Sequence, residues 1–303
     1  MKEEMIKKIE KLFIEGKISE EVKDKLLKEI EDLNKIKYEE KFKTNYKNIE
    51  INLIFEDIEI EGSDEVSNII FEKGREGFEV EEDDDNLIIN SKSRGLHIDI
   101  FGIRFGSDIY TENAKIILPL NSNLIINNIS GNIDVKKIIG NLKLKTISGD
   151  IRIKNIEGKI DCNSISGDIK ANKIKGEFNI ISKSGDIDID DIEEEGVIKT
   201  YSGDLEIKDG NFKKIFLSTF SGDHKLDNVN INDSMEIKNT SGEVNLNLLT
   251  KDIKIIIENK TGEGRINYEG KVTKIGRGEI SFGEGSKKLF IKTTSGDINI
   301  NID

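Results

Sequence analysis

The sequence predicts a mainly β fold: a single-stranded parallel β-solenoid with coils of about 18 residues, preceded by a small N-terminal α-helical hairpin. Three observations lead to this prediction. The phrase Ser-Gly-Asp-Ile recurs at a fixed period, glycines recur at half that period, and apolar residues alternate with polar ones between the glycines. A fixed period of this size indicates a solenoid, and alternation with a period of two is typical of half-buried strands.

The repeated phrase sets the length of the coils. Its first five copies, from Ser130 to Ser202, are each 18 residues apart; the steps then lengthen to 19 and 20 residues, and a last copy begins at Ser295. A second glycine series, including Gly140 and Gly158, falls halfway between the copies. Glycine recurs where the chain needs a positive φ or passes close to another backbone, so the series predicts two turns and two short strands per coil.

Stacking the coils in register separates an inner surface from an outer one. The outward positions include Arg152, Lys170 and Asp188, which we expect to face water. No single coil can bury its own apolar face, whereas stacked coils can. The two clearest inward columns are Ile133, Ile151, Ile169, Ile187 and Leu205, and Ile138, Ile156, Ile174 and Ile192.

The pattern divides the chain into two parts. Residues 1–44 are predicted to form the helical hairpin and a linker, and residues 45–303 the solenoid. Within the solenoid we expect irregular first coils at 45–125, regular coils at 126–262 and an irregular end at 263–303. The strand-like segments between residues 48 and 125 fit either degenerate coils or a small preceding sheet, and we favour degenerate coils.

The helical hairpin carries the candidate partner-binding residues. Ser19 is a plausible N-cap of its second helix. Two such short helices are not stable alone, so their apolar stripe should dock on the solenoid as an end-cap, on another copy of the chain, or on a protein partner. The stripe consists of Ile6, Ile9, Phe13, Val22, Leu26, Ile30 and Leu33.

Composition and charge restrict the partners. The net charge is −13, and most of it lies in the acidic stretch 56–85, so there is no basic stripe of the kind that phosphate backbones require, and we expect no nucleic-acid binding. No run of apolar residues is long enough for a transmembrane segment. The first residues lack the apolar core of a secretory signal, which predicts a cytoplasmic protein; a cell-surface or envelope-associated location is the alternative. The single cysteine excludes an internal disulfide.

Few residues suggest chemistry. The stacked aspartates of the Ser-Gly-Asp turns could form a calcium-binding ladder, but a role in shaping the turns is the better interpretation. The run Asp83-Asp84-Asp85 fits a solvated hairpin tip better than a cation site. His224 falls in an inward column and is expected to turn outward or to be hydrogen-bonded; Cys162 is expected to be an inert apolar filler. We therefore expect no catalytic residues, no metal site and no cofactor.

The repeated Ser-Gly-Asp-Ile phrases, together with the closing segment Thr293 to Ile298, resemble the bacterial putative-adhesin β-solenoid family, a domain of unknown function. The segment from Ile9 to Leu33 looks like the SHOCT-like helical hairpin that precedes such solenoids. The resemblance implies an envelope-associated protein, similar to members linked to cell-envelope stress, and it brings no catalytic residues.

The function expected from these observations is a non-enzymatic interaction scaffold, adhesin-like, in cell-envelope stress sensing or regulation. Its partners would be a protein or a second copy bound through the N-terminal helices, and a cell-envelope ligand. Two alternatives stay open: a carbohydrate-active β-helix lyase or hydrolase, and a structural subunit that stacks end to end. A groove with paired carboxylates on residues 60–115 would favour the enzyme.

Overall fold

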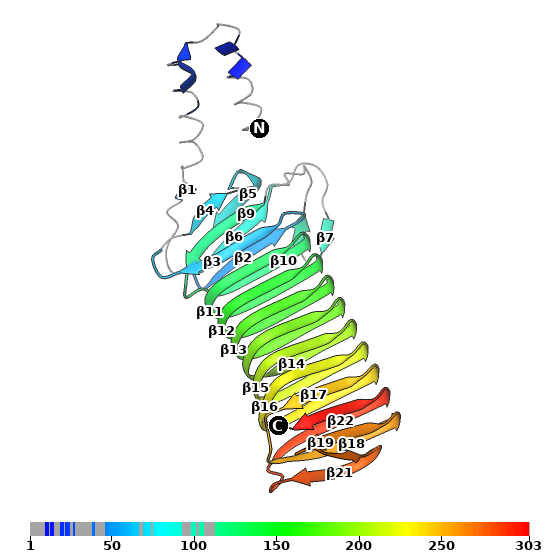
Figure 1. Ribbon diagram of the computed structural model, residues 1–303. Helices are drawn as coiled ribbons and strands as arrows, with labels where there is room; N and C mark the ends of the chain where they lie inside the picture. Colours follow the sequence, from blue (N-terminus) through cyan, green and yellow to red (C-terminus); the bar gives the residue numbers. More distant parts are fainter. Residues whose placement is uncertain are drawn as a thin grey trace.

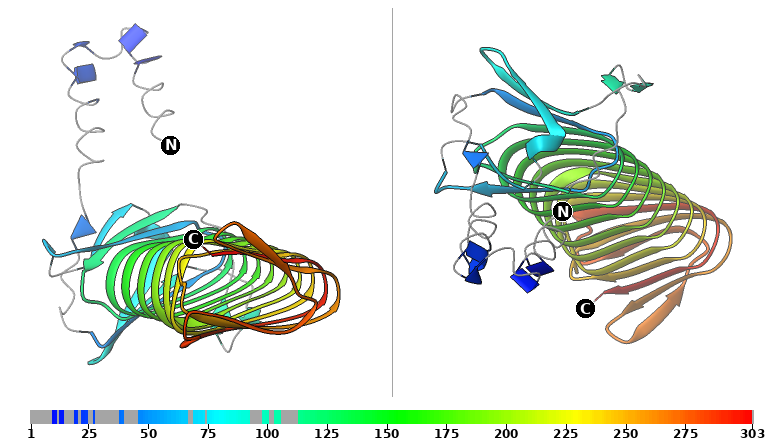
Figure 2. Two further views of the ribbon diagram at one scale, coloured as in Figure 1. Left: turned by 60° about the horizontal axis from the view of Figure 1, so that its bottom comes forward. Right: turned by 90° about the horizontal axis from the view of Figure 1, so that it is seen from above.

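The computed structural model describes residues 46–66, 69–73, 75–92, 98–100, 103–105 and 113–302, and short pieces of the N-terminal 45 residues. It confirms the solenoid. Parallel strands stack into a rod, and each coil is a flattened loop around a continuous apolar interior (Figures 1 and 2). The regular part comprises β11 (Ile133–Ser148), β12 (Ile151–Ser166), β13 (Ile169–Ser184), β14 (Ile187–Ser202), β15 (Leu205–Ser221) and β16 (His224–Ser241).

The register of the regular coils is the one that the repeat predicts. Ile151 pairs with Ile169, and Ile169 pairs with Ile187, in parallel ladders. Every member of the two inward columns is at most 2% exposed, whereas Arg152 and Lys170 point into solvent. Cys162 is also fully buried in an apolar column, and this burial raises the pKa of its thiol, as expected for an inert filler.

The prediction of two short strands per coil is wrong. Each coil from β11 to β14 is one strand of 16 residues that continues around the corner halfway along it. The corner bends at a non-glycine residue with positive φ, such as Lys137 (55°) or Asn155 (56°), and Gly140 three residues after Lys137 stays paired with Gly158. The strand therefore continues along both flat sides of the rod, although the pairing skips corner residues such as Lys137 and Asn155 and shifts register between Glu194 and Glu195.

The N-terminal end consists of degenerate coils, as favoured, but they do not stack in sequence order. β2 (Asn48–Leu53) and β3 (Ile58–Ser63) form a coil that lies directly on β10 (Leu124–Ser130) and β11. β6 (Asn86–Ser91) and β9 (Ala114–Pro119), which come later in the chain, lie outside it. Antiparallel strands β4 (Ile70–Lys73), β5 (Phe78–Glu82) and β1 (Tyr38–Glu39) then close this end, and 3₁₀-helix η1 (Arg75–Gly77) lies between β4 and β5.

The C-terminal end has the same kind of crossover. β17 (Val244–Leu248) continues from β16, and β18 (Ile253–Thr261) and β19 (Gly264–Tyr268) form the outermost coil. The last coil, β22 (Lys287–Ser295) and β23 (Ile298–Ile302), is inserted beneath it, and antiparallel β20 (Lys271–Lys274) and β21 (Arg277–Phe282) cover the tip (Figure 1). At both ends antiparallel strands therefore cover the parallel stack, which limits pairing with other chains.

The expectation that His224 turns outward or is hydrogen-bonded is wrong. It occupies the inward column between Leu205 and Val244 and is fully buried. Neither ring nitrogen has a hydrogen-bond partner, so the residue is neither turned outward nor hydrogen-bonded. Desolvation lowers the pKa of His224 to about 4, so the ring is neutral at pH 7.

Two hairpins lie at the N-terminal end of the solenoid. A separate hairpin, β7 (Ile98–Ile100) and β8 (Ile103–Phe105), lies beside the N-terminal coils. The acidic run Asp83-Asp84-Asp85 is the exposed tip of the β5–β6 hairpin, as expected, where Asp83 accepts backbone N–H bonds from Asp85 and Asn86. The side-chain hydrogen bond from Asn86 is the main cause that lowers the pKa of Asp83, and these two backbone bonds lower it further.

Candidate binding groove

The turn edge of the rod carries the acidic ladder, and the structure gives it a structural role. The carboxylate of each turn aspartate accepts a hydrogen bond from the backbone N–H of the matching residue in the next coil, as in Asp168 to Asp150 (3.1 Å) and Asp186 to Asp168 (2.9 Å). The turn-shaping interpretation is thus confirmed, although the bonded N–H belongs to the neighbouring turn. Within the described ranges, no group of three or more metal-ligating side chains converges.

One flat side of the rod is basic, although the chain is acidic. We call it the basic face; it comprises the outward side chains of the second halves of β11–β16, and of β22 and β18. Its lysines are Lys143, Lys145, Lys159, Lys183, Lys199, Lys214, Lys238, Lys254, Lys260, Lys288 and Lys292. Its carboxylates are Asp161, Glu177, Glu195, Asp233, Glu236 and Glu258, and all of these except Asp161 and Glu195 pair with lysines of the same face. Such a local excess of one sign attracts ligands of the opposite charge.

The opposite side differs in charge. We call it the mixed face; it comprises the outward side chains of the first halves of β11–β16. Basic and acidic residues are equally numerous there and pair between coils, as in Lys170 with Asp188 (3.2 Å) and Lys225 with Glu206. The acidic turn ladder lies along the edge between the two faces.

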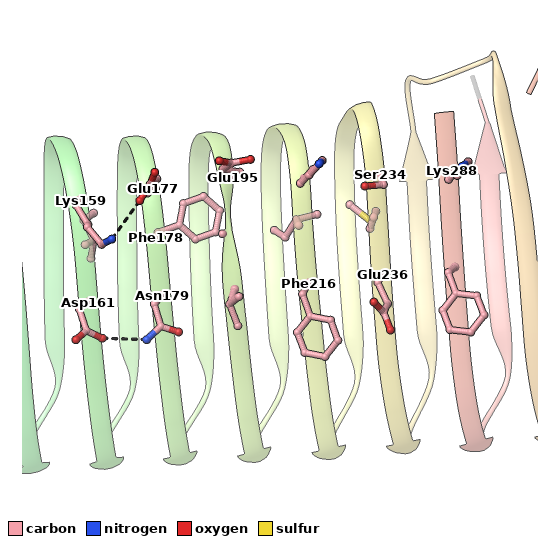
Figure 3. Close-up of a pocket in the computed structure, with 17 residues that line it drawn as sticks. Lys159, Asp161, Glu177, Phe178, Asn179, Glu195, Phe216, Ser234, Glu236 and Lys288 are labelled. Atoms are coloured by element: carbon pink, nitrogen blue, oxygen red, sulfur yellow. Dashed lines mark hydrogen bonds and ion pairs between the residues drawn. The ribbon is translucent and has the colours of Figure 1, made fainter. Parts of the chain in front are cut away.

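A groove of about 820 Å³ runs along the basic face across six coils, from Lys159 on β12 to Lys288 on β22 (Figure 3). Two parallel rows of side chains line it. In Figure 3 the upper row carries Lys159, Glu177, Glu195, Ser234 and Lys288, and the lower row carries Asp161, Asn179, Phe216 and Glu236. Because coils in a parallel sheet lie about 4.8 Å apart, the groove is roughly 24 Å long.

The lower row ends in the phenyl ring of Phe216, the carboxylate of Glu236 and the phenyl ring of Phe290. Phe216 pairs in register with Glu236, and Glu236 pairs with Phe290, so the three side chains lie on successive coils. The ammonium groups of Lys199 and Lys238, from the coils on either side, lie 5.3 and 5.0 Å from the centroid of the Phe216 ring. Cation–π contacts of this length fix the positions of the lysines.

The local sequence explains why the groove forms here. Phe178 points inward and is 3% exposed, and in the next coil its ring fills the position that Gly196 leaves free. A Cβ at Gly196 would lie 2.3 Å from the Phe178 ring, so the pair is a large–small match. Just before Gly196, the pairing of β14 with β15 shifts between Glu194 and Glu195, where the coil lengthens to 19 residues. Gly196 and Phe178 line the groove beside this bulge.

A second hollow lies on residues 61–65, where paired carboxylates would have favoured an enzyme. Lys137 donates a 2.7 Å hydrogen bond to Glu61. That bond holds the pKa of the Glu61 carboxyl below its ordinary value. A general acid in glycoside hydrolysis needs a raised pKa, so Glu61 has the opposite property.

The predicted partner-binding residues are only partly described. Phe13 and Val22 are helical; Val22 is 44% exposed, and Lys23 lies over the Phe13 ring at 4.4 Å. The backbone N–H of Val22 donates to Ser19 Oγ at 3.3 Å, which confirms Ser19 as an N-cap. Ile6, Ile9, Leu26, Ile30 and Leu33 lie outside the described residues. The apolar stripe and the hairpin therefore stay predictions.

Comparison with known proteins identifies the family. A family model described as Toastrack DUF4097 matches residues 46–301. The chain belongs to this family. The match supports the expected kinship with a β-repeat domain of unknown function, and the Toastrack domain includes all of the solenoid strands from β2 to β22. No curated protein matches the chain.

Two crystal structures are similar to the Toastrack domain. One, described as a putative adhesin from Bacteroides fragilis NCTC 9343, has 10% sequence identity and a TM-score of 0.41 over 86% of this chain and 94% of its own. The other, described as a putative cell adhesion protein from Clostridium sporogenes ATCC 15579, has 16% identity and a TM-score of 0.18 over 88% of this chain and 100% of its own. Both TM-scores are below 0.5, and we draw nothing from either name. Among the described residues, no helix has the length and apolar composition needed to cross a membrane.

Sequence reasoning singled out the turns and missed the groove. The signal was present in one outward column of the Toastrack repeats, where the groove-lining residues Phe216 and Phe290 stand in place of polar ones. On the same face but outside the groove lining, Tyr201 and Phe220 are 62% and 61% exposed. Large exposed apolar side chains gathered on one face indicate an interaction surface.

Proposed function

We propose that this Toastrack protein is a non-enzymatic interaction scaffold that acts at the cell envelope, in stress sensing or regulation. The solenoid is the rigid body that presents a ligand-binding face. The N-terminal residues 1–44 are the element through which a regulatory protein or a second copy is bound.

One observation carries the proposal: the basic face is built from outward positions of paired parallel strands, whose register shifts only beside Glu195 and Lys214. Functional side chains on packed strands are held more firmly than those on loops. The short Gly-Asp turns leave no long loops beside this face, and the carboxylates of the turns are engaged by neighbouring backbone N–H groups. A long groove on a rigid rod suits the binding of an extended ligand better than catalysis on a small substrate.

Two measurements test this function. First, purified full-length protein is mixed with the isolated envelope fraction of the source bacterium and sedimented; we expect it to pellet with the envelope and to be released by salt, because its binding face is charged. Second, intact cells are treated with protease, and loss of the protein from them would place it on the outer surface. A protein that stays in the supernatant at low salt would contradict the scaffold function.

The proposed role in stress sensing has a separate test. Deletion of the coding sequence should change the activity of an envelope-stress reporter when the cells are treated with an envelope-damaging agent. An unchanged reporter over the full dose range would contradict a role in stress sensing and leave only the binding role.

A further inference from the structure

We propose that copies of this chain join head to tail, with the end formed by residues 249–302 of one rod against the end formed by residues 46–119 of the next. The partner is a second copy of the chain, and the contact is separate from the envelope-binding face proposed above. It follows from an open strand edge at each end of the rod, from apolar side chains left partly uncovered there, and from the opposite charges of the two ends.

Both ends of the rod finish in strands that run back against the coil beneath them. At one end β4 and β5 pair antiparallel with β9 and β6, and at the other β20 and β21 pair antiparallel with β19 and β18 (Figure 1). These strands cover the parallel coils, but within the described ranges β5, β20 and β21 each pair with a single strand. Their outer edges are therefore open, and an open edge is a template for pairing with another chain.

The open edge of β5 presents backbone groups that an incoming strand can bond. At the end of the ladder between β5 and β6, the backbone N–H of Asp83 donates to Asn86 O at 3.0 Å. Because hydrogen bonds to one neighbour alternate along an antiparallel strand, Val80 and Glu82 direct their N–H and C=O groups away from β6. In the described part of the chain these outward groups have no partner.

The open edge of β21 presents similar groups. Asp252 O accepts a hydrogen bond from the N–H of Lys287 on β22, at 3.4 Å, so the alternate residues of β18 that begin with Ile253 bond to β21 instead. The residues of β21 opposite them are therefore bonded, and Glu279 and Ser281 between these direct their N–H and C=O groups outward. Both ends of the rod can thus add a strand.

Apolar side chains at the margin of the core are left partly uncovered at these ends. Val80 on β5 and Ile280 and Phe282 on β21 pack against the core but are only partly buried, whereas the inward columns of the regular coils are buried. Joining two rods would cover these side chains and continue the apolar interior from one rod into the next. Removal of apolar surface from water favours such a contact.

The two ends differ in net charge. Residues 46–119, which we call the acidic end, contain eighteen carboxylates and seven basic residues. Residues 249–302, which we call the basic end, contain seven carboxylates and ten basic residues. Two acidic ends therefore repel each other strongly and two basic ends repel weakly, whereas an acidic end attracts a basic end.

The outermost strands carry unpaired charges of the same sign as their ends. Glu79 and Glu81 on β5 are exposed and have no ion pair in the part of the chain that the structure describes. The same holds for Lys271 on β20 and Arg277 on β21, and the remaining charged residues of β20 and β21 are engaged in ion pairs within their own end. Because the two joined surfaces differ and lie at opposite ends of the rod, the contact extends into an open chain of rods.

The first test follows full-length protein by sedimentation velocity over a range of concentrations. At low salt we expect the sedimentation coefficient to rise with concentration beyond that of a dimer, and at about 1 M salt we expect the rise to be lost, because the charges are screened. Association through apolar helices of residues 1–44 would not be weakened by salt, so salt separates the two contacts. A coefficient that does not change with concentration at low salt, or a rise that salt leaves unchanged, would overturn the proposal.

Charge reversal then tests the polarity of the contact. Glu79→Lys with Glu81→Lys makes the outermost strands of both ends basic, and Lys271→Glu with Arg277→Glu makes those of both ends acidic, so neither variant alone should assemble. An equimolar mixture should assemble again, because each variant then meets an end of opposite sign. Lys154→Glu with Lys208→Glu on the mixed face is the matched control and should assemble like the unaltered protein. Circular dichroism checks that every variant is folded, and a mixture of folded variants that stays unassembled would overturn the head-to-tail contact.

Discussion

The carboxylate of Asp186 accepts a 2.8 Å hydrogen bond from the backbone N–H of Asp204, which holds the same place in the next coil. The relationship repeats in seven successive steps from Asp57 to Glu243. Each turn is therefore anchored on the turn before it, by a charge-assisted bond except where the neutral amide oxygen of Asn132 is the acceptor. The residue type that defines the repeat is needed for stacking, and its side chain is occupied.

Asp186→Ala should lower the free energy of unfolding by about 1–3 kcal/mol, because the N–H of Asp204 loses its acceptor. Asp186→Asn should restore most of that loss, since Asn132 fills the same role with its amide oxygen. Urea-induced unfolding followed by circular dichroism measures both. If the asparagine variant were as unstable as the alanine variant, charge alone would be responsible, and the hydrogen-bond account would fail.

Gly149→Ala should be much more damaging. A Cβ at Gly149 would lie 2.1 Å from the carbonyl oxygen of Gly131 in the preceding coil, and its φ of 127° is unfavourable for alanine. We expect a loss of more than about 3 kcal/mol in thermal unfolding, or failure to fold. Gly276→Ala is the control, because nothing lies within 4 Å of a Cβ there and it is expected to be neutral. Similar melting of the two variants would contradict the close stacking of turns.

His224→Val should stabilise the protein by about 1–2 kcal/mol, because it removes two buried nitrogens without partners and matches Val244 in the same column. The pKa of His224 is about 4 when folded and 6.5 when unfolded, so between these values the unfolded chain binds the extra proton. The native protein should therefore lose about 2 kcal/mol of stability as pH falls from 7 to 5.

The valine variant should lack that share of the pH dependence. Urea midpoints of both proteins at pH 7 and pH 5 measure the difference. An equal loss in both would mean that His224 is not the group that titrates, and a less stable valine variant at pH 7 would mean that its ring nitrogens do have partners.

The sequence predicts the regular coils because each inward position repeats. A shift of one residue would place Arg152 inside and Ile151 outside, so the register of β11 to β15 has one solution. The ends could not be predicted in the same way. Nothing local in β22 and β23 distinguishes a coil added at the tip from one inserted beneath β18 and β19, because the same apolar columns accept either.

The groove was not predictable from periodicity, because it lies where the period changes. Gly196 and Phe178 belong to the same column, and only their juxtaposition in neighbouring coils shows that one fills the space of the other. His224 was misjudged because a polar residue in an apolar column is usually turned out or bonded; here the stack continues through it. The groove and the burial of His224 both depend on contacts between neighbouring coils, which the sequence of a single coil does not show.

Removing residues 1–44, which takes away the two-residue strand β1 but none of the coils, should leave the solenoid folded with cooperative melting, because the described coils bury their own core. The same deletion should abolish self-association or capture of a regulatory partner. Circular dichroism and analytical ultracentrifugation measure the two properties. A truncated protein that aggregates or melts far earlier would mean that the helices are an end-cap of the rod.

The central claim is that the basic face is the ligand-binding surface, and lysine footprinting tests it most directly. Full-length protein is acetylated with and without the isolated envelope fraction, and each lysine is quantified by mass spectrometry. We predict protection of Lys199, Lys214 and Lys288 on the basic face, and none of Lys154, Lys170 and Lys208 on the mixed face. Protection of the mixed face, or equal protection of both faces, would contradict the account.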